Sequence, residues 1–459
     1  MGAIITLSIL GILVLYLGLF KAKSALLPVS LLGLAASATL LILDWNKSAT
    51  PIFEGMVIFD RFSIAFSVLC IVVTGLILML SRDYFERIST RVGEYFALML
   101  FSLVGAVLMT AFHNMTMLFI GVEIMSVALY ILAGIRKKDF GSNEAALKYF
   151  LMGAFSTGFL LFGIALLYGA SGSFDLGVIR QYVIDNPGNV PNMFYVGILL
   201  LIVGLAFKVG AAPFHFWAPD VYEGSPVLIT IFMSTIVKAA AFAGFLRIFS
   251  YCFTPLEDFW VPVLLVITII TLFVGNITAL VQHSFKRMLA YSSISHAGYM
   301  LFGIVVIGAA SSGALLLYAS AYSLATVVAF GSLILVKRTS GSDDFESFNG
   351  LAKRNPRLAL TITIAMLSLA GIPLTAGFIG KFMLFANVLA DYQVLLVVVA
   401  VINAAMGIYY YFRVIIAMYF KPTERDVVAF PVNYQVVFGI AAILIILIGV
   451  YPTLLSSLL

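Results

Sequence analysis

The sequence predicts an all-α polytopic membrane protein. Three observations support this prediction: 63% of the residues are hydrophobic, only 10% are charged, and the mean hydropathy is +1.12. A soluble domain needs more polar surface than this composition supplies. Apolar segments recur along the chain, and each approaches or exceeds the roughly 20 residues that cross a bilayer. Lipid offers no hydrogen-bond partner to backbone groups, so every span is expected to be helical.

Fourteen candidate spans follow from this criterion, and two polar stretches, 172–192 and 338–357, are predicted to be loops too short to form a second domain. The spans cover residues 2–20, 25–43, 62–81, 94–112, 114–134, 143–169, 193–222, 225–250, 259–281, 285–308, 312–336, 358–390, 393–420 and 433–456. The first of them lacks a basic segment and a small-residue cleavage site, so it is interpreted as a span and not as a signal peptide.

The basic residues test the span count, because lysine and arginine concentrate in cytoplasmic loops. Seventeen follow odd-numbered spans: Lys21, Lys23, Arg82, Arg87, Arg91, Arg136, Lys137, Lys138, Lys286, Arg287, Lys337, Arg338, Lys353, Arg354, Arg357, Lys421 and Arg425. Four follow even-numbered spans: Lys47, Arg61, Arg180 and Arg247. This bias predicts that both termini face away from the cytoplasm. It also explains the net charge of +5 without a nucleic-acid partner.

The sequence carries no cofactor motif. Cys70 and Cys252 lie in apolar segments and form no CxxC, iron–sulfur or zinc pattern. Neither GxGxxG nor a P-loop occurs. We therefore expect no cofactor and no metal bound to this chain.

Five basic residues outside the count above lie inside the spans, as does one glutamate at the middle of its span. They are Glu123, in FIGVEIMSVALYILAG, and Lys148, Lys208, Lys238, Lys381 and Arg413. A charge at the bilayer centre costs from about 3 to above 10 kcal/mol, so such residues pair with each other, contact water or face the bundle interior. Structural ion pairs are one interpretation. However, four lysines and one glutamate cannot all be neutralised pairwise. The alternative is that several of these lysines bind and release protons.

Two of the six fit a proton relay less well. Lys148 lies near the end of its span with Glu144 one turn away, and its long side chain can reach the interface. Arg413 carries a permanent charge, which suits a structural or field-setting role. Beside Glu123, Gly121 and Ser126 are small, which suits close packing against a neighbouring helix or subunit.

The seventh and twelfth spans contain helix-breaking segments close to a lysine. The first reads GLAFKVGAAPFHFWAPDVYEGSP (204–226), and the second reads LSLAGIPLTAGFIGKF (367–382). Proline interrupts the helical hydrogen bonds, and unwound backbone at membrane depth is tolerated only against protein or water. A simple proline kink is the alternative. Broken helices beside ionisable residues are typical of ion paths in transporters.

Residue spacing predicts an internal repeat. The interval from Glu123 to Lys208 equals the interval from His296 to Lys381, so one constant offset relates the two pairs. We call this shift in residue number the repeat offset. Adding the repeat offset to the residue number of Lys238 gives a position two residues from Arg413. The second copy begins five spans after the first. Because five is an odd number, the two copies must face opposite ways across the membrane. We expect N-terminal spans in 1–93, repeats in 94–250 and 259–420, and a last span in 433–459.

Histidine is the second candidate relay type. His296 lies in AYSSISHAGYM (290–300) with Tyr299, Ser292 and Ser295 on or near the same face, and its ordinary pKa of about 6.5 suits proton transfer. A hydrogen-bonded core histidine is the alternative. His215, followed by Asp220 and Glu223, indicates either an exit path or a solvated helix end. His113 and His283 lie at span ends, and no role is assigned to them.

Five segments of the chain resemble one family. FIGVEIMSVALYILAG, EAALKYFLMGAFSTGFLLFGIALLYGASG, FKVGAAPFHFWAPDVYEGSP, AYSSISHAGYM and LAGIPLTAGFIGKF look like the antiporter-like membrane subunits of proton-pumping NADH:quinone oxidoreductase, respiratory complex I. The resemblance covers about residues 60–420. The family pattern places a Glu in helix 5, Lys in helices 6 and 7, Lys or His in helix 8, and Lys or Glu in helix 12. Glu123, Lys148, Lys208, Lys238 and Lys381 occupy these places.

Within the family, the long C-terminal amphipathic helix of the largest member is not expected here, because the sequence stops after span 14. The middle member carries Glu where this chain has Lys381. KYFLMGAF and PDVYEGSP look most like the remaining member.

The resemblance implies a proton-translocating subunit of a bacterial inner-membrane complex. Glu123, Lys208, Lys238 and Lys381 would form the main proton relay, with Lys148 and His296 as secondary members. NADH, FMN, iron–sulfur clusters and quinone would bind to partner subunits, and neighbouring antiporter-like subunits and lipid would contact this chain. A subunit of a multisubunit sodium/proton antiporter or of a membrane-bound hydrogenase is the first alternative. A structural membrane scaffold is the second. A receptor is disfavoured, because no sizeable extramembrane domain is present.

Overall fold

The computed structural model describes residues 1–20, 22–47, 49–88, 91–308, 310–390, 394–422 and 426–459. Lys21 and Arg425, which entered the count of basic residues, lie outside the described residues, as does the side chain of Arg82.

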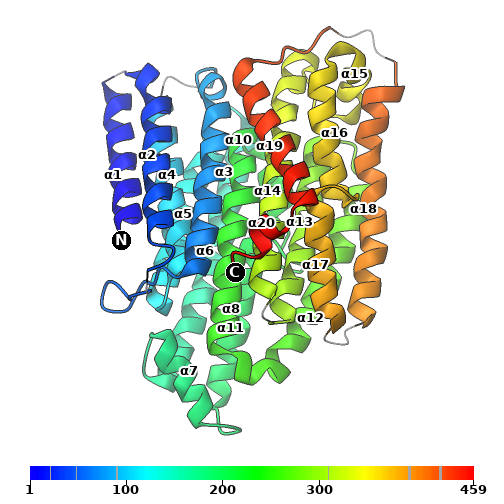
Figure 1. Cartoon of the computed structure of the whole chain (residues 1–459). Coiled ribbons are helices and arrows are strands. Elements are labelled where there is room, and N and C mark those ends of the chain that lie inside the picture. The colour runs from blue at the N-terminus through cyan, green and yellow to red at the C-terminus, as the bar shows by residue number, and fades with distance from the viewer. Residues whose placement is uncertain (21, 48, 89–90, 309, 391–393, 423–425) are drawn as a thin grey trace.

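The described chain is almost entirely helical, and its helices stand side by side in one bundle (Figure 1). In chain order the elements are α1 (Gly2–Leu19), α2 (Lys23–Leu43), α3 (Arg61–Phe85), α4 (Val92–Ala111), α5 (Met115–Ala133), α6 (Phe140–Ser171), α7 (Leu176–Asp185), α8 (Asn192–Val209), α9 (Trp217–Gly224), α10 (Val227–Phe232), the π-helix η1 (Met233–Val237), α11 (Lys238–Cys252), η2 (Thr254–Leu256), α12 (Glu257–Leu280), α13 (Phe285–Val305), α14 (Ser311–Ser340), η3 (Phe345–Phe348), α15 (Leu351–Arg354), α16 (Pro356–Ala370), α17 (Ala376–Ala390), α18 (Val394–Phe420), α19 (Val432–Val450) and α20 (Thr453–Ser456).

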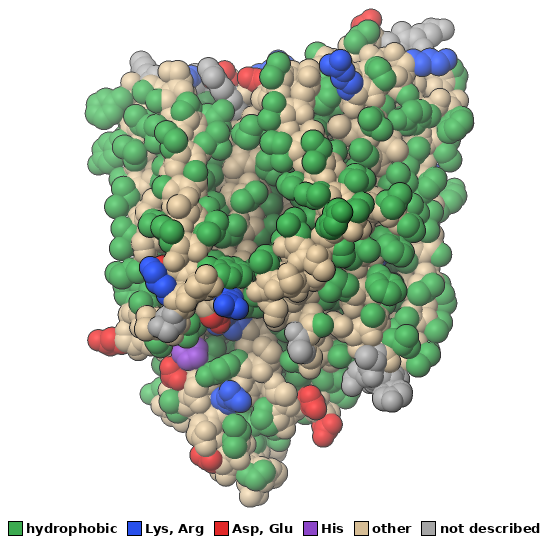
Figure 2. Space-filling model, viewed as in Figure 1, with side chains coloured by type: hydrophobic (Ala, Val, Ile, Leu, Met, Phe, Trp, Pro, Cys, Tyr) green, Lys and Arg blue, Asp and Glu red, His purple; other side chains and the backbone are tan. Residues whose placement is uncertain are grey.

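The polytopic prediction is confirmed. Thirteen helices of the described residues are long and apolar enough to cross a membrane. The predicted span 358–390 accounts for the difference from fourteen, because two shorter apolar helices, α16 and α17, form it. Apolar side chains cover most of the bundle wall in Figure 2. The α10–α11 segment and α14 are buried on all sides, and they form the centre of the bundle.

Both predicted helix breaks are present. Helix α8 ends at Gly210, and α16 ends at Gly371, where each glycine has a left-handed backbone with φ of 71° and 82°. Glycine has no Cβ atom and adopts this conformation at little cost, which explains its presence at both positions. The interval from Gly210 to Gly371 is shorter than the repeat offset, so the offset that relates the charged residues does not relate the breaks.

The predicted polar loop 172–192 is wrong in part, because it contains helix α7. Asp175 caps this helix by accepting hydrogen bonds from the backbone amides of Gly177 and Val178. Leu176, Ile179 and Val183 lie on one face and are buried. A short amphipathic helix escapes detection when the surrounding polar residues dominate the pattern. The loop 338–357 likewise contains two short helices, η3 and α15.

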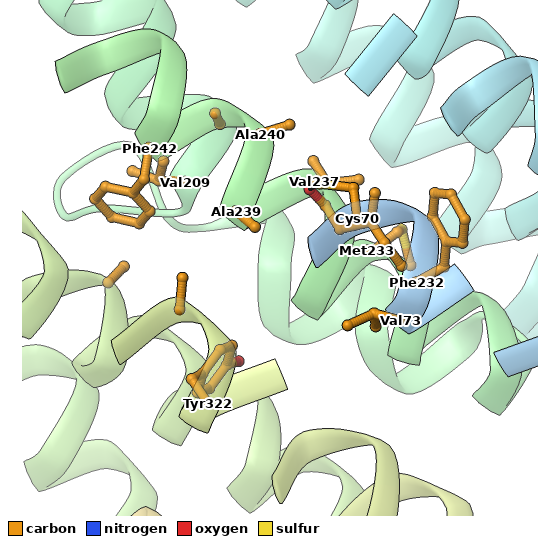
Figure 3. Packing of buried hydrophobic residues seen from close by; sticks show 14 of the residues in the cluster. Cys70, Val73, Val209, Phe232, Met233, Val237, Ala239, Ala240, Phe242 and Tyr322 are labelled. Atoms are coloured by element: carbon orange, nitrogen blue, oxygen red, sulfur yellow. Dashed lines mark hydrogen bonds between the residues drawn. The ribbon is translucent and has the colours of Figure 1, made fainter. Parts of the chain in front are cut away.

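The predicted span 225–250 is a single segment whose middle turn is a π-helix, η1. This wider turn changes the direction in which the following residues point. Figure 3 shows Met233 and Val237 of η1 beside Cys70 of α3. The Cys70 thiol donates to the Ile236 carbonyl at 3.9 Å, so α3 packs directly on the irregular turn.

Helices α4 and α5 approach closely through glycine. A Cβ atom at Gly105 would lie 2.5 Å from the backbone nitrogen of Met125 and 2.6 Å from the carbonyl oxygen of Gly121. The hydroxyl of Ser102 donates to the Met125 carbonyl at 3.0 Å across the same contact. Gly105 therefore fixes the position of α5, which carries Glu123.

Arg247 of α11 joins three segments at the end of the bundle that carries α7. Its guanidinium donates to Asp60 at 2.6 Å and to the Thr110 carbonyl at 3.0 Å. Burial alone would raise the pKa of the Asp60 carboxyl, but the charge and hydrogen bond of Arg247 and the hydrogen bonds from Ser63 outweigh it and hold this pKa below its ordinary value of 3.8.

Substitution of Gly105 by alanine is expected to push α5 away from α4 and to destabilise the protein by about 1–3 kcal/mol, as overpacking does. Thermal unfolding of the detergent-solubilised protein measures this. Gly158→Ala in α6 is the matched control, since nothing lies within 4 Å of its Cβ position. Equal unfolding midpoints for the two variants would contradict the close-contact argument.

Because the folded-state pKa of Asp60 is lowered, its ion pair with Arg247 stabilises the protein fully above the ordinary carboxyl pKa and is lost as pH falls through the lowered value. We expect the unfolding midpoint to fall between about pH 6 and pH 3 by more in the native protein than in Asp60→Asn. Asp44→Asn is the control, because Asp44 pairs with Lys47 on the surface. An unchanged acid dependence in Asp60→Asn would refute the assignment.

Candidate functional site

Three buried lysines and one buried histidine of the described residues form the candidate site. Lys208, Lys238 and Lys381 are 2%, 1% and 6% exposed, and His296 is equally buried. They come from α8, α11, α17 and α13. Among the described residues, none of the three lysines forms an ion pair with a carboxylate. Each ammonium is instead held by oxygen atoms that carry no formal charge.

Lys208 lies in the last turn of α8, immediately before the break. Its Nζ donates to the hydroxyl oxygen of Ser126 in α5 at 2.5 Å. That hydroxyl in turn donates to the Val122 carbonyl. The rings of Tyr130 and Tyr149 face the ammonium at 5.9 and 6.0 Å. The negative end of the α8 dipole also favours a cation at this position.

Glu123 lies one turn before Ser126 on α5 and is half-buried. Its Oε1 is buried without a hydrogen-bond partner in the described chain. The carboxylate is close enough to Lys208 for their charges to interact, but the two groups do not touch. Among the described residues, Ser126 therefore supplies the hydrogen bond that links Lys208 to α5.

Lys238 follows the π-helix directly. Its Nζ donates to the backbone carbonyl oxygen of Ser293 in α13. A lysine at this position of a regular α-helix would project in a different direction, because the π-turn adds a residue to the preceding turn. The irregular turn thus aims Lys238 at α13, the helix that also carries His296.

His296 is bound by a tyrosine hydroxyl at each ring nitrogen. Nδ1 lies 2.6 Å from the Tyr318 hydroxyl of α14, and Nε2 lies 2.9 Å from the Tyr411 hydroxyl of α18. Tyr411 also bonds to the hydroxyl of Ser292. A tyrosine hydroxyl can donate or accept. The imidazole can therefore take up or lose a proton at either nitrogen without losing a partner.

The predicted neighbours of His296 are only partly confirmed. The ring of Tyr299 lies 6.0 Å from the imidazole ring. Ser292 reaches it through Tyr411. Ser295 instead donates to the Ser292 carbonyl, so it serves the helix backbone.

Lys381 caps the first half of the broken twelfth span. Its Nζ donates to the carbonyl oxygens of Leu369 and Ala370 at 3.1 Å each. These belong to the last turn of α16, where carbonyls have no partner within the helix. The ammonium also lies 4.7 Å from the Tyr299 ring. The Tyr299 ring thus lies close to both His296 and Lys381.

Contacts in one half of the site recur in the other half at the repeat offset, and the charged residues alone did not show this. Ser126 contacts Lys208, and the repeat offset carries this pair onto Tyr299 and Lys381, which also touch. The same offset carries Lys238 onto Tyr411, which bonds to His296. Arg413, close by on α18, instead donates to the Leu280 and Gln282 carbonyls and caps α12, as a structural role predicts.

Lys148 lies apart from the buried lysines. Its side chain is 40% exposed and forms ion pairs of 2.7 Å with Glu144 and with Asp220. Asp220 also pairs with Arg287 at 3.3 Å, and Arg287 pairs with Glu223. This network ties α6, α9 and α13 together at one end of the bundle.

The predicted cluster of His215, Asp220 and Glu223 is not brought together around the histidine. The two carboxylates belong to the ion-pair network, whereas His215 is buried in the break of span 7 with Nδ1 unpartnered in the described chain. Within the described residues, no group of three or more His, Cys, Asp or Glu side chains is arranged to hold a metal ion.

Sequence reasoning missed five residues that contact the buried ionisable groups: Ser126, Tyr130, Tyr149, Tyr318 and Tyr411. For Ser126 it predicts only close packing. A polar side chain facing inward in an apolar helix was the available signal for all five, since such residues must find a partner inside the bundle.

Comparisons with known proteins agree with this arrangement. A family described as NADH:quinone oxidoreductase/Mrp antiporter, TM, matches residues 112–407. A relative named NADH-quinone oxidoreductase subunit N, from Flavobacterium psychrophilum, is 41% identical over 100% of both chains. A chain of respiratory complex I from Thermus thermophilus is 34% identical, with a TM-score of 0.85 over 99% of this chain and 98% of that one.

A chain of the Mrp complex from Dietzia has a TM-score of 0.88 at 18% identity, over 99% of this chain and 95% of that one, which shows a shared fold. The complex I relatives are closer in sequence and cover the whole chain or nearly so. With the family match over residues 112–407, they show that the chain belongs to the NADH:quinone oxidoreductase/Mrp antiporter family of transmembrane proteins.

Proposed function

We propose that this chain translocates protons as the N-type membrane subunit of NADH:quinone oxidoreductase. The chain itself carries no redox chemistry. NADH, FMN, iron–sulfur clusters and quinone bind to partner subunits, whose reaction supplies the energy. The complex lies in the bacterial inner membrane, with both termini of this chain on the non-cytoplasmic side.

One observation carries the proposal: Lys208, Lys238 and Lys381 are buried, and each is held by neutral oxygen atoms. A carboxylate in contact would fix the proton on the lysine, as in a structural ion pair. Hydroxyl and carbonyl oxygens stabilise the ammonium less strongly, so a modest change of field can decide whether it keeps its proton. This argues against a scaffold of fixed ion pairs.

Glu123 supplies that change of field. Two unit charges 4 Å apart attract by about 4 kcal/mol at the effective dielectric constant typical of proteins. When Glu123 approaches Lys208, the ammonium keeps its proton. When the carboxylate is drawn toward a neighbouring subunit, the proton leaves. The outward face of α5 beside Glu123 carries exposed Ile120, Ile124 and Val127, which suits contact with an antiporter-like neighbour or lipid.

The released proton passes through Lys238 and His296 to Lys381. The Tyr299 ring lies close to the last two, and the tyrosines on both ring nitrogens allow His296 to accept at one nitrogen and release at the other. Lys148 takes a secondary role at the rim of the path, where its partner Asp220 also pairs with α13.

We further propose the division into N-terminal spans (1–93), two inverted repeats (94–250 and 259–420) and a last span (433–459). The recurrence of the Ser126–Lys208 contact as Tyr299–Lys381 at the repeat offset supports it. Matching helix pairs also touch in the two halves: α4 with α5 and α6 with α8, then α12 with α13 and α14 with α16.

The transported ion distinguishes the proposed function from that of a sodium/proton antiporter. Transport driven by NADH and independent of sodium supports the proposal, whereas sodium-dependent exchange without NADH supports the alternative.

Glu123→Gln keeps the shape of the side chain and removes its charge. We expect quinone reductase activity and proton pumping to fall together by at least tenfold, which corresponds to about 1.4 kcal/mol of lost transition-state stabilisation. Inverted membrane vesicles allow both to be measured, and native gel electrophoresis checks assembly. Glu257→Gln, an exposed glutamate at the start of α12, is the control.

A second test removes the lysines. A variant with Lys208, Lys238 and Lys381 all replaced by methionine should assemble but not pump. Full pumping by this variant would refute the relay.

Ser126→Ala leaves Lys208 without its side-chain acceptor. A lost hydrogen bond to a buried charged group costs about 1–3 kcal/mol, so pumping is expected to fall roughly five- to a hundredfold. Ser102→Ala, which removes another buried hydroxyl between α4 and α5, controls for packing. Equal pumping rates in the two variants would exclude a functional role of Ser126.

A further inference from the structure

The end of the bundle opposite α7 contains a cavity of about 990 Å³. Five stretches distant in sequence surround it: the end of α3 with the start of α4, the loop between α5 and α6, the junction of α9 and α10, the start of α13 and the end of α14. None of the relay residues lines it. The basic-residue bias places this end on the cytoplasmic side.

Positive charge dominates the cavity wall. Of the 18 described residues that line it, eight are lysine or arginine and two are acidic. Arg87, Arg136, Lys137, Lys138, Lys337 and Arg338 are among the eight. Lysines and arginines of cytoplasmic loops usually point into water separately. Here they converge on one concave space from four directions.

Both acidic side chains of the wall already have partners. Asp139 accepts from the backbone amide of Gly141 at 3.0 Å and lies 3.8 Å from Arg136. Glu223 is paired with Arg287, which does not line the cavity. Outside the wall, Asp343 pairs with Lys337 at 3.2 Å and Glu94 lies 3.8 Å from Arg91. The other basic residues of the wall except Arg136 have no ion pair with a carboxylate among the described residues, so the wall keeps an excess of positive charge.

Two cations are held in the wall at an electrostatic cost. Lys286 is buried and donates to the carbonyl oxygens of Glu223 and Ser225 at 2.6 Å each, yet it also feels the charges of Lys337 and Arg136. One terminal nitrogen of Arg338, Nη2, is buried and has no hydrogen-bond partner among the described residues. A buried guanidinium donor without an acceptor is costly, and it indicates that an acceptor binds there.

We propose that this cavity binds a phosphate-bearing anion. A phosphate group accepts several hydrogen bonds at once, and the planar fork of arginine matches its geometry. The apolar Ile88 and Ile334 in the same wall suit the glycerol and upper acyl region of a lipid whose headgroup enters from the membrane surface. Anionic phospholipid and inorganic phosphate share this recognition chemistry, and basic pockets between spans on the cytoplasmic side favour both.

The test compares two double variants in the assembled complex. Lys137→Gln with Lys138→Gln removes two exposed charges from the cavity wall. Lys353→Gln with Lys421→Gln removes two exposed charges from the same predicted face outside the cavity and serves as the matched control. A third variant adds Arg338→Gln to the first. Because the loop lysines are exposed, the first variant is expected to fold even if the third does not.

Each complex is reconstituted in phosphatidylcholine vesicles that contain a photoreactive phosphatidylglycerol, and cross-linked peptides are mapped by mass spectrometry. In a second arm, binding of radiolabelled inorganic phosphate is measured by equilibrium dialysis. The cavity variant, Lys137→Gln with Lys138→Gln, should bind one of these probes roughly 10- to 30-fold more weakly than the native complex, because each basic residue contributes about 1 kcal/mol to binding. The control variant should bind both probes as the native complex does.

Loss of cross-links to the peptides around residues 136–141 and 334–338 identifies a lipid headgroup. Loss of phosphate binding without such cross-links identifies a soluble anion. Either result supports the site. Equal binding by the cavity variant and the control in both arms would overturn it.

Discussion

The cost of burying charge where water is scarce governs this structure. Each interior lysine must be stabilised by the protein, and the protein uses hydroxyl and carbonyl oxygens instead of carboxylates. Lys208 has the Ser126 hydroxyl, Lys238 has the Ser293 carbonyl, and Lys381 has two carbonyls of α16. Neutral oxygens offset enough of the desolvation cost to keep the lysines inside, but they do not fix the proton in place as an ion pair would.

Irregular helix geometry accompanies each interior lysine, and for Lys381 it supplies the partners. A regular helix uses its carbonyls internally, whereas a broken one leaves those of its last turn free. The break at Gly371 provides the acceptors for Lys381, and the break at Gly210 ends α8 just after Lys208. The π-turn before Lys238 redirects that side chain. Each irregularity costs backbone stability and is tolerated because the surrounding helices cover it.

At the ends of the bundle, charged side chains are stabilised by ion pairs instead. Lys148, Asp220 and Arg287 form a network where water screens the charges, and Arg247 pairs with Asp60 at the opposite end. Partners of opposite charge thus hold helices together at the ends of the bundle, whereas partners without charge hold the lysines and His296 in the interior. This contrast separates the structural ion pairs from the proposed relay.

The membrane class, the spans, both helix breaks and the buried Lys208, Lys238, Lys381 and His296 could be predicted from the sequence. These are local properties. An apolar run of sufficient length, a proline or glycine within it, and a charged residue within an apolar span can each be recognised within one segment. Helix α7 was missed, because its short apolar face is hidden among polar residues. Which groups meet could not be predicted. Ser126, not Glu123, contacts Lys208 from 82 residues away, and Tyr411 reaches His296 across 115 residues. A hydrogen-bond partner depends on how distant helices are rotated and placed against one another, and that follows from the packing of the whole bundle.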